Sequence, residues 1–129
     1  MFKNLTLILV IALFIIGIGK KSFSYERNSR LHSLNEFNVK KNTYRLLRTK
    51  KCSGCYLVNA KLSRVDLRNA DLRNANLIGA TFIKSTLLGA NLQGAKTAGA
   101  NFSGAVWVDG SLCQQGSIGT CLRKQTPEE

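Results

Sequence analysis

The chain has 129 residues, with 19 Lys and Arg against 7 Asp and Glu, a net charge of +12, four cysteines and one histidine. It contains no Ser/His/Asp grouping, no paired acids and no phosphate-binding loop, so its composition excludes the common enzyme classes. We expect no catalytic, cofactor-binding or metal-binding residues.

The N-terminus carries an uncharged, mostly apolar stretch at residues 5–19. This length suits the central region of a signal peptide and is below the ~20 residues that a spanning helix needs. Ser22 and Ser24 are small residues suited to a cleavage site, so we predict that residues 1–24 are a signal peptide and that Tyr25 begins the mature chain. The alternative is an uncleaved membrane anchor through residues 5–19, because basic residues follow that stretch.

Residues 25–51 form a basic segment. Removing residues 1–24 leaves 16 basic and 7 acidic residues, a net charge of +9 that is concentrated here. A short helix at 39–49, capped by Asn38, is predicted to cover the open edge of the following region. Three apolar side chains would make the contact: Val39, Leu46 and Leu47. The outer side would be a solvated basic surface or a binding surface for anionic lipid or an acidic protein.

From Cys55 to Gln114 the sequence repeats every five residues, twelve times. The central position is large and apolar in every repeat except at Thr97, and the position two residues earlier is small except at Val65. Five residues advance about 500° around a helix, so this period makes no helical stripe. In extended segments residues two apart share a face. The second residue after the central residue of a repeat is often Gly or Asn, which tolerate the positive φ that a corner needs.

Three of these repeats match the consensus A(D/N)LXX: Ala70-Asp71-Leu72-Arg73-Asn74, Ala75-Asn76-Leu77-Ile78-Gly79 and Ala90-Asn91-Leu92-Gln93-Gly94. This is the consensus of the pentapeptide-repeat family, which the chain resembles over 60 of its 129 residues. The resemblance implies an all-β fold, a right-handed quadrilateral β-helix of about three coils, within residues 52–114. The coils would span 55–74, 75–94 and 95–114. Stacked at the inter-strand spacing, they would be about 14 Å tall.

Coils of 20 residues would stack residues that are 20 apart. Two inner apolar columns are predicted: Leu62, Phe82 and Phe102, and Leu72, Leu92 and Leu112. In the last coil, the Thr97 hydroxyl would need a backbone carbonyl inside, or the coil would be distorted. Trp107 is large for the same interior. We therefore expect the final coil to open into a C-terminal cap, followed by a flexible tail, at residues 115–129.

The four cysteines form two local pairs, one at each end of the repeat. An even number in this arrangement favours disulfide bonds in an oxidising compartment. We predict a disulfide between Cys113 and Cys121. Cys52 and Cys55 are predicted to be a second disulfide or a thiol pair.

The Cys52–Cys55 motif also has the spacing of a redox pair or of half a zinc site. Because Tyr56 follows, it is not a c-type haem attachment motif, and His32 is the only histidine, which disfavours zinc. A redox pair needs an exposed thiolate, whereas Cys55 falls at an inward position of the first coil. A structural role is therefore favoured over the redox and metal alternatives.

The start of the repeat at 46–55 and its end at 107–121 resemble those of exported, largely cyanobacterial, members of the family. This resemblance implies a Gram-negative periplasm or a thylakoid lumen. Export in turn disfavours nucleic acid as a partner.

The best-understood activity of the family is mimicry of DNA by long acidic β-helices that inhibit DNA gyrase. This chain differs in length and in charge. Its coil region has a net charge of +3, from six basic and three acidic residues: Lys61, Arg64, Arg68, Arg73, Lys84 and Lys96 against Asp66, Asp71 and Asp109. A short cationic stack cannot imitate a polyanion, so binding of the DNA-gyrase type is not expected.

Apolar residues also fall at outward positions of the coils: Val58, Ile78, Ile83, Leu88 and Val108. Coils about 4.8 Å apart would join stacked residues into a patch, a candidate surface for an unknown protein partner or for self-association. Single exposed apolar residues are also ordinary. The sequence thus predicts an exported, non-catalytic structural or protein-interaction module. The alternatives are a thiol redox protein using Cys52 and Cys55, and a binder of anionic membrane surfaces through the basic segment.

Overall fold

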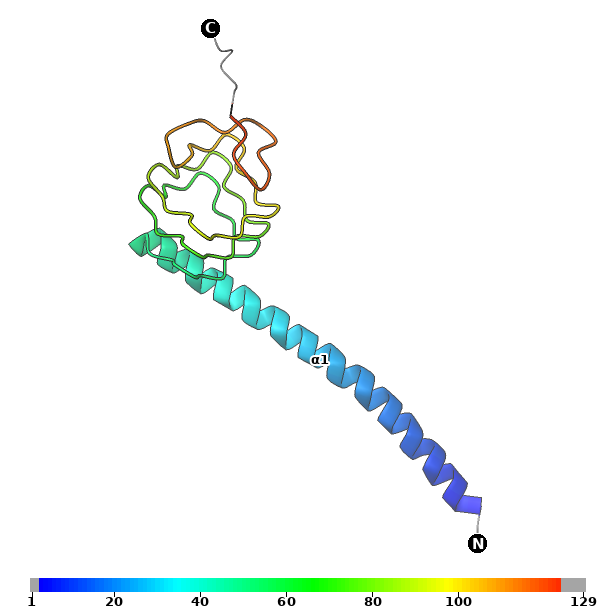
Figure 1. Cartoon of the computed structure of the whole chain (residues 1–129). Coiled ribbons are helices and arrows are strands. Elements are labelled where there is room, and N and C mark those ends of the chain that lie inside the picture. The colour runs from blue at the N-terminus through cyan, green and yellow to red at the C-terminus, as the bar shows by residue number, and fades with distance from the viewer. Residues whose placement is uncertain (1–2, 124–129) are drawn as a thin grey trace. The chain divides into compact units, whose positions relative to one another are not determined.

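The computed structural model describes residues 3–123, with side chains from residue 25 onward (Figure 1). It divides into two compact units, Met1–Glu36 and Phe37–Glu129. A single helix of the described residues, α1 (Lys3–Thr49), contributes to both units. The predicted signal peptide falls where side chains are not described, and the end of the predicted tail, 124–129, lies outside the described residues. Within the described part of the chain, no helix is long and apolar enough to cross a bilayer.

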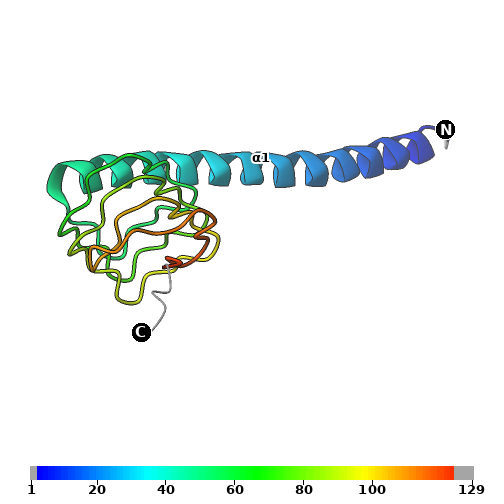
Figure 2. The same cartoon turned by 90° about the horizontal axis from the view of Figure 1, so that it is seen from above.

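Backbone pairing between residues 20 apart builds the coil stack of the second unit (Figure 2). Eight parallel bridges run from Lys51 with Asp71 to Thr86 with Val106. Flanking hydrogen bonds continue the pairing; for example, the Leu72 N–H donates to the Asn91 carbonyl at 2.9 Å. A 20-residue register is what four pentapeptides per coil require.

A tight turn follows each central residue of the stack. In the turn after Leu77, the Ala80 N–H donates to the Leu77 carbonyl at 3.0 Å, and Gly79 has a φ of 67°. A positive φ at the third residue is characteristic of type II turns and explains the preference for Gly and Asn there. The Asn59 side chain lies against Gly79, where a Cβ atom would come within 2.2 Å of Asn59 Oδ1.

The interior is formed by the inward columns. Phe82 and Phe102 are fully buried, and their rings stack with centroids 5.1 Å apart. Trp107 contacts Phe102 edge to face, with centroids 4.9 Å apart. Where Ser85 replaces the usual alanine, its buried hydroxyl donates to the Leu62 carbonyl. The predicted column of Leu62, Phe82 and Phe102 is therefore confirmed.

The third coil is shorter than predicted. Parallel pairing ends at Val106, which then pairs antiparallel with Leu112. The Trp107 N–H donates to the Ser111 carbonyl at 2.7 Å, so the chain turns back within five residues. This reversal carries Leu112 out of the stack, where it is 65% exposed. Its predicted place inside, in the column of Leu92, is wrong, and the cap begins before residue 115.

The cap covers only one half of the last coil. The Thr97 hydroxyl donates to the Gly119 carbonyl at 2.7 Å, which provides the inner partner that the sequence required. Phe102 and Gly104 donate their N–H groups to cap carbonyls. By contrast, the N–H groups of Leu92 and Gly94 make no hydrogen bond within residues 3–123. One half of this end therefore keeps unpaired backbone groups.

α1 is not the short helix that the sequence predicted. Asn38 lies inside it rather than at its N-cap. The helix continues upstream of the predicted start, and no proline interrupts residues 3–49.

The last turns of α1 lie across the first coil, at the end opposite the cap (Figure 1). Leu46 is fully buried and Val39 packs against the core, but Leu47 is 41% exposed. Val39 and Leu46 are two turns apart on one face, whereas Leu47 is rotated by about 100° from Leu46. The predicted contact by Leu47 is wrong. The helix ends at Thr49, and Lys50 follows it with a positive φ of 57°.

Candidate functional site

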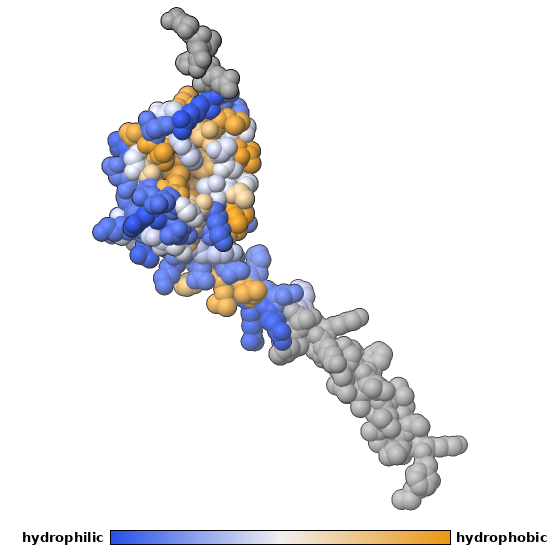
Figure 3. Space-filling model, in the orientation of Figure 1, coloured by the Kyte–Doolittle hydropathy of each residue, from blue (hydrophilic) through white to orange (hydrophobic). Residues whose placement is uncertain are grey.

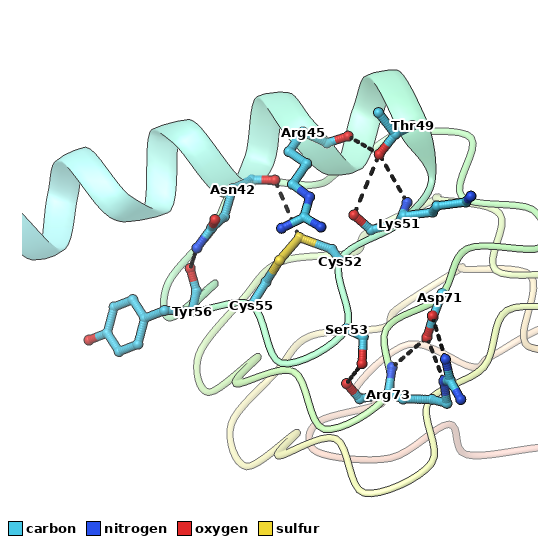
Figure 4. The surroundings of a disulfide bond; sticks show 10 residues. All are labelled: Asn42, Arg45, Thr49, Lys51, Cys52, Ser53, Cys55, Tyr56, Asp71 and Arg73. Carbon is cyan, nitrogen blue, oxygen red and sulfur yellow. Dashed lines mark hydrogen bonds and ion pairs between the residues drawn. A yellow bond between two sulfur atoms is a disulfide. The ribbon is translucent and has the colours of Figure 1, made fainter.

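The Cys52–Cys55 motif lies beneath the last turns of α1 and is joined as a disulfide (Figure 4). Cys52 is fully buried and Cys55 is 6% exposed. The Asn42 carbonyl oxygen of α1 lies 3.5 Å from Cys52 Sγ. Neither sulfur is placed as the accessible thiolate that thiol exchange requires.

Side chains near the end of α1 also satisfy the edge of the first coil. Asn42 Nδ2 donates to the Tyr56 carbonyl at 3.0 Å, and Lys50 Nζ donates to the Asp66 carbonyl. These bonds pair carbonyls that have no preceding coil to bind. Sequence reasoning missed both residues, because polar and basic residues on a helix carry no pattern that marks an edge contact.

The second cysteine pair lies in the cap, where Cys113 and Cys121 are joined as a disulfide. Cys113 is buried and Cys121 half-buried. Ser117 is buried beside them; its hydroxyl donates to the Gln114 carbonyl at 2.7 Å and accepts from the Leu122 N–H at 3.0 Å. The disulfide and this serine hold the cap as one compact loop. No cysteine of the described residues is free.

The acidic residues of the stack are paired with arginines on its surface. Arg68 binds Asp66 with a nitrogen–oxygen distance of 2.7 Å, and Arg73 binds Asp71 at 2.9 Å. The hydrogen bond from the Arg73 side chain lowers the pKa of Asp71 to about 2, and Arg68 lowers the pKa of Asp66 in the same way. Both acids are therefore ionised at neutral pH. Neither has the raised pKa of a general acid.

Asp109, at the cap, is likewise bound by neighbouring side chains that lower its pKa. Its pKa is lowered, first by the Ser111 hydroxyl, which donates to Asp109 Oδ1 at 2.6 Å. Arg123 also binds this carboxylate, at 2.9 Å. The three coil-region acids are thus tied to structural partners.

The described residues form no metal site, since no three His, Cys, Asp or Glu side chains among them are close enough to hold an ion. His32 is exposed on α1. Every buried side-chain nitrogen and oxygen in this part of the chain has a hydrogen-bond partner.

The predicted apolar surface is distributed over three columns. Ile78 is 39% and Leu88 44% exposed, whereas three of the five residues are half-buried: Val58, Ile83 and Val108. Ile78 and Leu88 are ten residues apart, which is half of a 20-residue coil, so they lie on opposite sides of the stack. On the face drawn in Figure 3, hydrophobic side chains lie in separate spots among hydrophilic ones. The expectation of one joined patch is wrong; two separate surfaces remain as candidates.

The coil stack is a solenoid of parallel coils, each in contact with the next. Its sequence matches the family model described as pentapeptide repeats, in eight copies, at residues 51–89 and 87–106. This range coincides with the first and last residues of the parallel bridges. The pentapeptide-repeat family model therefore matches residues 51–106, as predicted. Proteins of this family fold as right-handed quadrilateral β-helices.

Two solved structures are similar to the chain. A pentapeptide repeat protein from the thylakoid lumen of Arabidopsis thaliana is 37% identical over 45% of this chain and 41% of that chain, with a TM-score of 0.44. HetL, a pentapeptide repeat protein involved in heterocyst differentiation regulation from the cyanobacterium Nostoc sp. strain PCC 7120, is 33% identical over 48% of this chain and 32% of that chain, with a TM-score of 0.37. The chain thus spans less than half the length of either protein. No curated protein matches it.

Proposed function

We propose that this protein is a non-catalytic module that binds another protein, built on a right-handed quadrilateral β-helix and exported to a periplasm or a thylakoid lumen. One observation carries the proposal: the buried polar side-chain atoms of the stack all have hydrogen-bond partners inside it, yet the stack exposes large apolar side chains at Ile78 and Leu88. Such side chains on a rigid stack are suited to contact with a partner. The acids on the same stack are paired and have no catalytic arrangement.

Serine substitutions at the two sites test this proposal. Because Ile78 and Leu88 lie on opposite sides, we expect Ile78→Ser or Leu88→Ser, but not both, to abolish co-purification of the partner from the native host. Each variant should lose only about 1 kcal/mol of its free energy of unfolding, because the changed side chain is partly exposed. Undiminished recovery of the partner with both variants would count against the proposal.

The alternative of a thiol redox protein has weaker support. A disulfide at Cys52–Cys55 is compatible with it, but both sulfurs are buried beneath α1. A reducing partner would first have to displace the helix. We therefore propose a structural role for this disulfide.

Export and oxidation can be tested together by mass spectrometry of the protein recovered from its host. We expect the mature chain to begin near Tyr25 and to contain two disulfides, Cys52–Cys55 and Cys113–Cys121, so that its mass is lower by four hydrogen atoms than that of the reduced form. The paired cysteines and the apolar stretch at 5–19 support this expectation. An intact N-terminus together with four free thiols would instead support a membrane-anchored protein in a reducing compartment.

A further inference from the structure

The solvent-facing side of α1 over the coil stack alternates aromatic and cationic side chains. Phe37, Lys41, Tyr44 and Arg48 are spaced by four, three and four residues, so they line one side of the helix. Phe37 is 63% and Tyr44 65% exposed, and both cationic residues are exposed. We refer to these four residues as the aromatic–basic face.

The coil stack does not cover this face. The buried side of the same helical turns is formed by Leu46, with Val39 partly buried against the core. The guanidinium carbon of Arg48 lies 5.7 Å from the centre of the Tyr44 ring, a cation–π contact at the surface. The rings of Phe37 and Tyr44 thus remain exposed to water, although other side chains of the same helical turns pack against the core of the coil stack.

The charge around this face is mostly positive, although Glu36 lies directly before Phe37. Residues 37–51 contain six basic residues and no acidic residue: Lys40, Lys41, Arg45, Arg48, Lys50 and Lys51. Asp66 and Asp71 of the stack are each bound to their own arginine, and they also attract Lys50 and Lys51, which lie beyond the aromatic–basic face. The complement of this face is therefore an anionic surface.

We propose that the aromatic–basic face binds the surface of an anionic lipid bilayer. Phe37 and Tyr44 lie at the level of the lipid headgroups, and Lys41 and Arg48 bind their phosphates. The face extends for about 16 Å along a convex helix. Protein partners usually bind through a few side chains that fill concave pockets, and a convex row of rings and cations has no such pocket. The same row fits the interface of a bilayer, which can deform around it. The contact would hold the coil stack beside the membrane, where its other surfaces stay available to a protein partner.

Vesicle binding by the full chain tests the charged residues. The vesicles contain either phosphatidylcholine alone or phosphatidylcholine with phosphatidylglycerol. We expect tight binding only to the anionic vesicles, and about 25-fold weaker binding by the double variant Lys41→Gln/Arg48→Gln, because each cation near an anionic surface contributes about fivefold. The matched control Lys84→Gln/Lys96→Gln removes the same charge from exposed sites on the stack and should weaken binding less than about threefold.

The aromatic residues are tested in the same assay. Phe37→Gln/Tyr44→Gln should weaken binding to anionic vesicles roughly tenfold, whereas Leu112→Gln, at an equally exposed apolar residue of the cap, should not. Equal binding by all variants would overturn the proposal. So would equal binding to neutral and anionic vesicles, which would assign the binding to residues 5–19. Loss of an acidic protein partner from the Lys41→Gln/Arg48→Gln variant, with vesicle binding unchanged, would overturn it in favour of a protein ligand.

Discussion

Replacing Phe82 by alanine is expected to lower the free energy of unfolding by about 3–5 kcal/mol, a loss that can unfold so small a stack. The Phe82 ring is fully buried and stacks on Phe102, which in turn contacts Trp107. Coils above and below hold its neighbours at a fixed spacing, so they cannot collapse into the space left by the ring. Denaturant titration followed by circular dichroism measures this loss.

Gln93→Ala is the matched control, since Gln93 is an exposed residue of the same coil stack. Its free energy of unfolding should change by no more than about 0.5 kcal/mol. Similar, small losses in both variants would show that Phe82 is not packed inside the stack.

Leu46→Ala should be the second most destabilising change, with an expected loss of about 2–5 kcal/mol. Leu46 is the fully buried side chain by which α1 contacts the core. Its removal should also loosen the hydrogen bonds that Asn42 and Lys50 make to the edge of the first coil. Denaturant titration gives the loss, and amide hydrogen exchange of Tyr56 and its neighbours shows the exposed edge.

The neighbouring Leu47 provides the control for this experiment. Leu47→Ala removes the same group from a side chain that is 41% exposed, so the loss should be clearly smaller. Equal losses at the two positions would mean that α1 does not pack through Leu46.

The register of the coil stack could be predicted from the sequence because each pentapeptide forms the same local structure. A large residue inside, a small residue two positions earlier and a corner residue two positions later recur through the stack. The column of Phe82 and Phe102 follows directly from that period. Non-local information is not needed to predict this register, because each coil contacts only neighbouring coils of the same pattern.

The end of the stack could not be predicted in the same way. Leu112 keeps the period of five, but it lies outside, because Val106 pairs antiparallel with it after a turn. That turn is held by its own hydrogen bonds, such as those from the Trp107 N–H to the Ser111 carbonyl and from the Ser111 hydroxyl to Asp109. A periodic pattern describes neighbours one coil apart and carries no information about a reversal.

The predictions of the helix length and of one joined apolar surface were wrong for a related reason. Asn38 is a good N-cap residue, but a cap forms only where the preceding chain leaves the helix, and here it does not. Ile78 and Leu88 were recognised as outward residues, yet their separation by half a coil places them on different sides. The pairing of Lys50 with the Asp66 carbonyl depends on where the helix ends relative to the first coil.

The 20-residue register also constrains how the length of this protein can change. The helix and the cap each contact particular sides of the coils at their own end of the stack. Adding 20 residues would raise the cap by one level and leave both ends on the same sides. Adding one pentapeptide would instead turn the cap by a quarter of a circuit and place Gly119 over a different corner. Viable relatives of this stack should therefore differ in length by whole circuits rather than by single repeats.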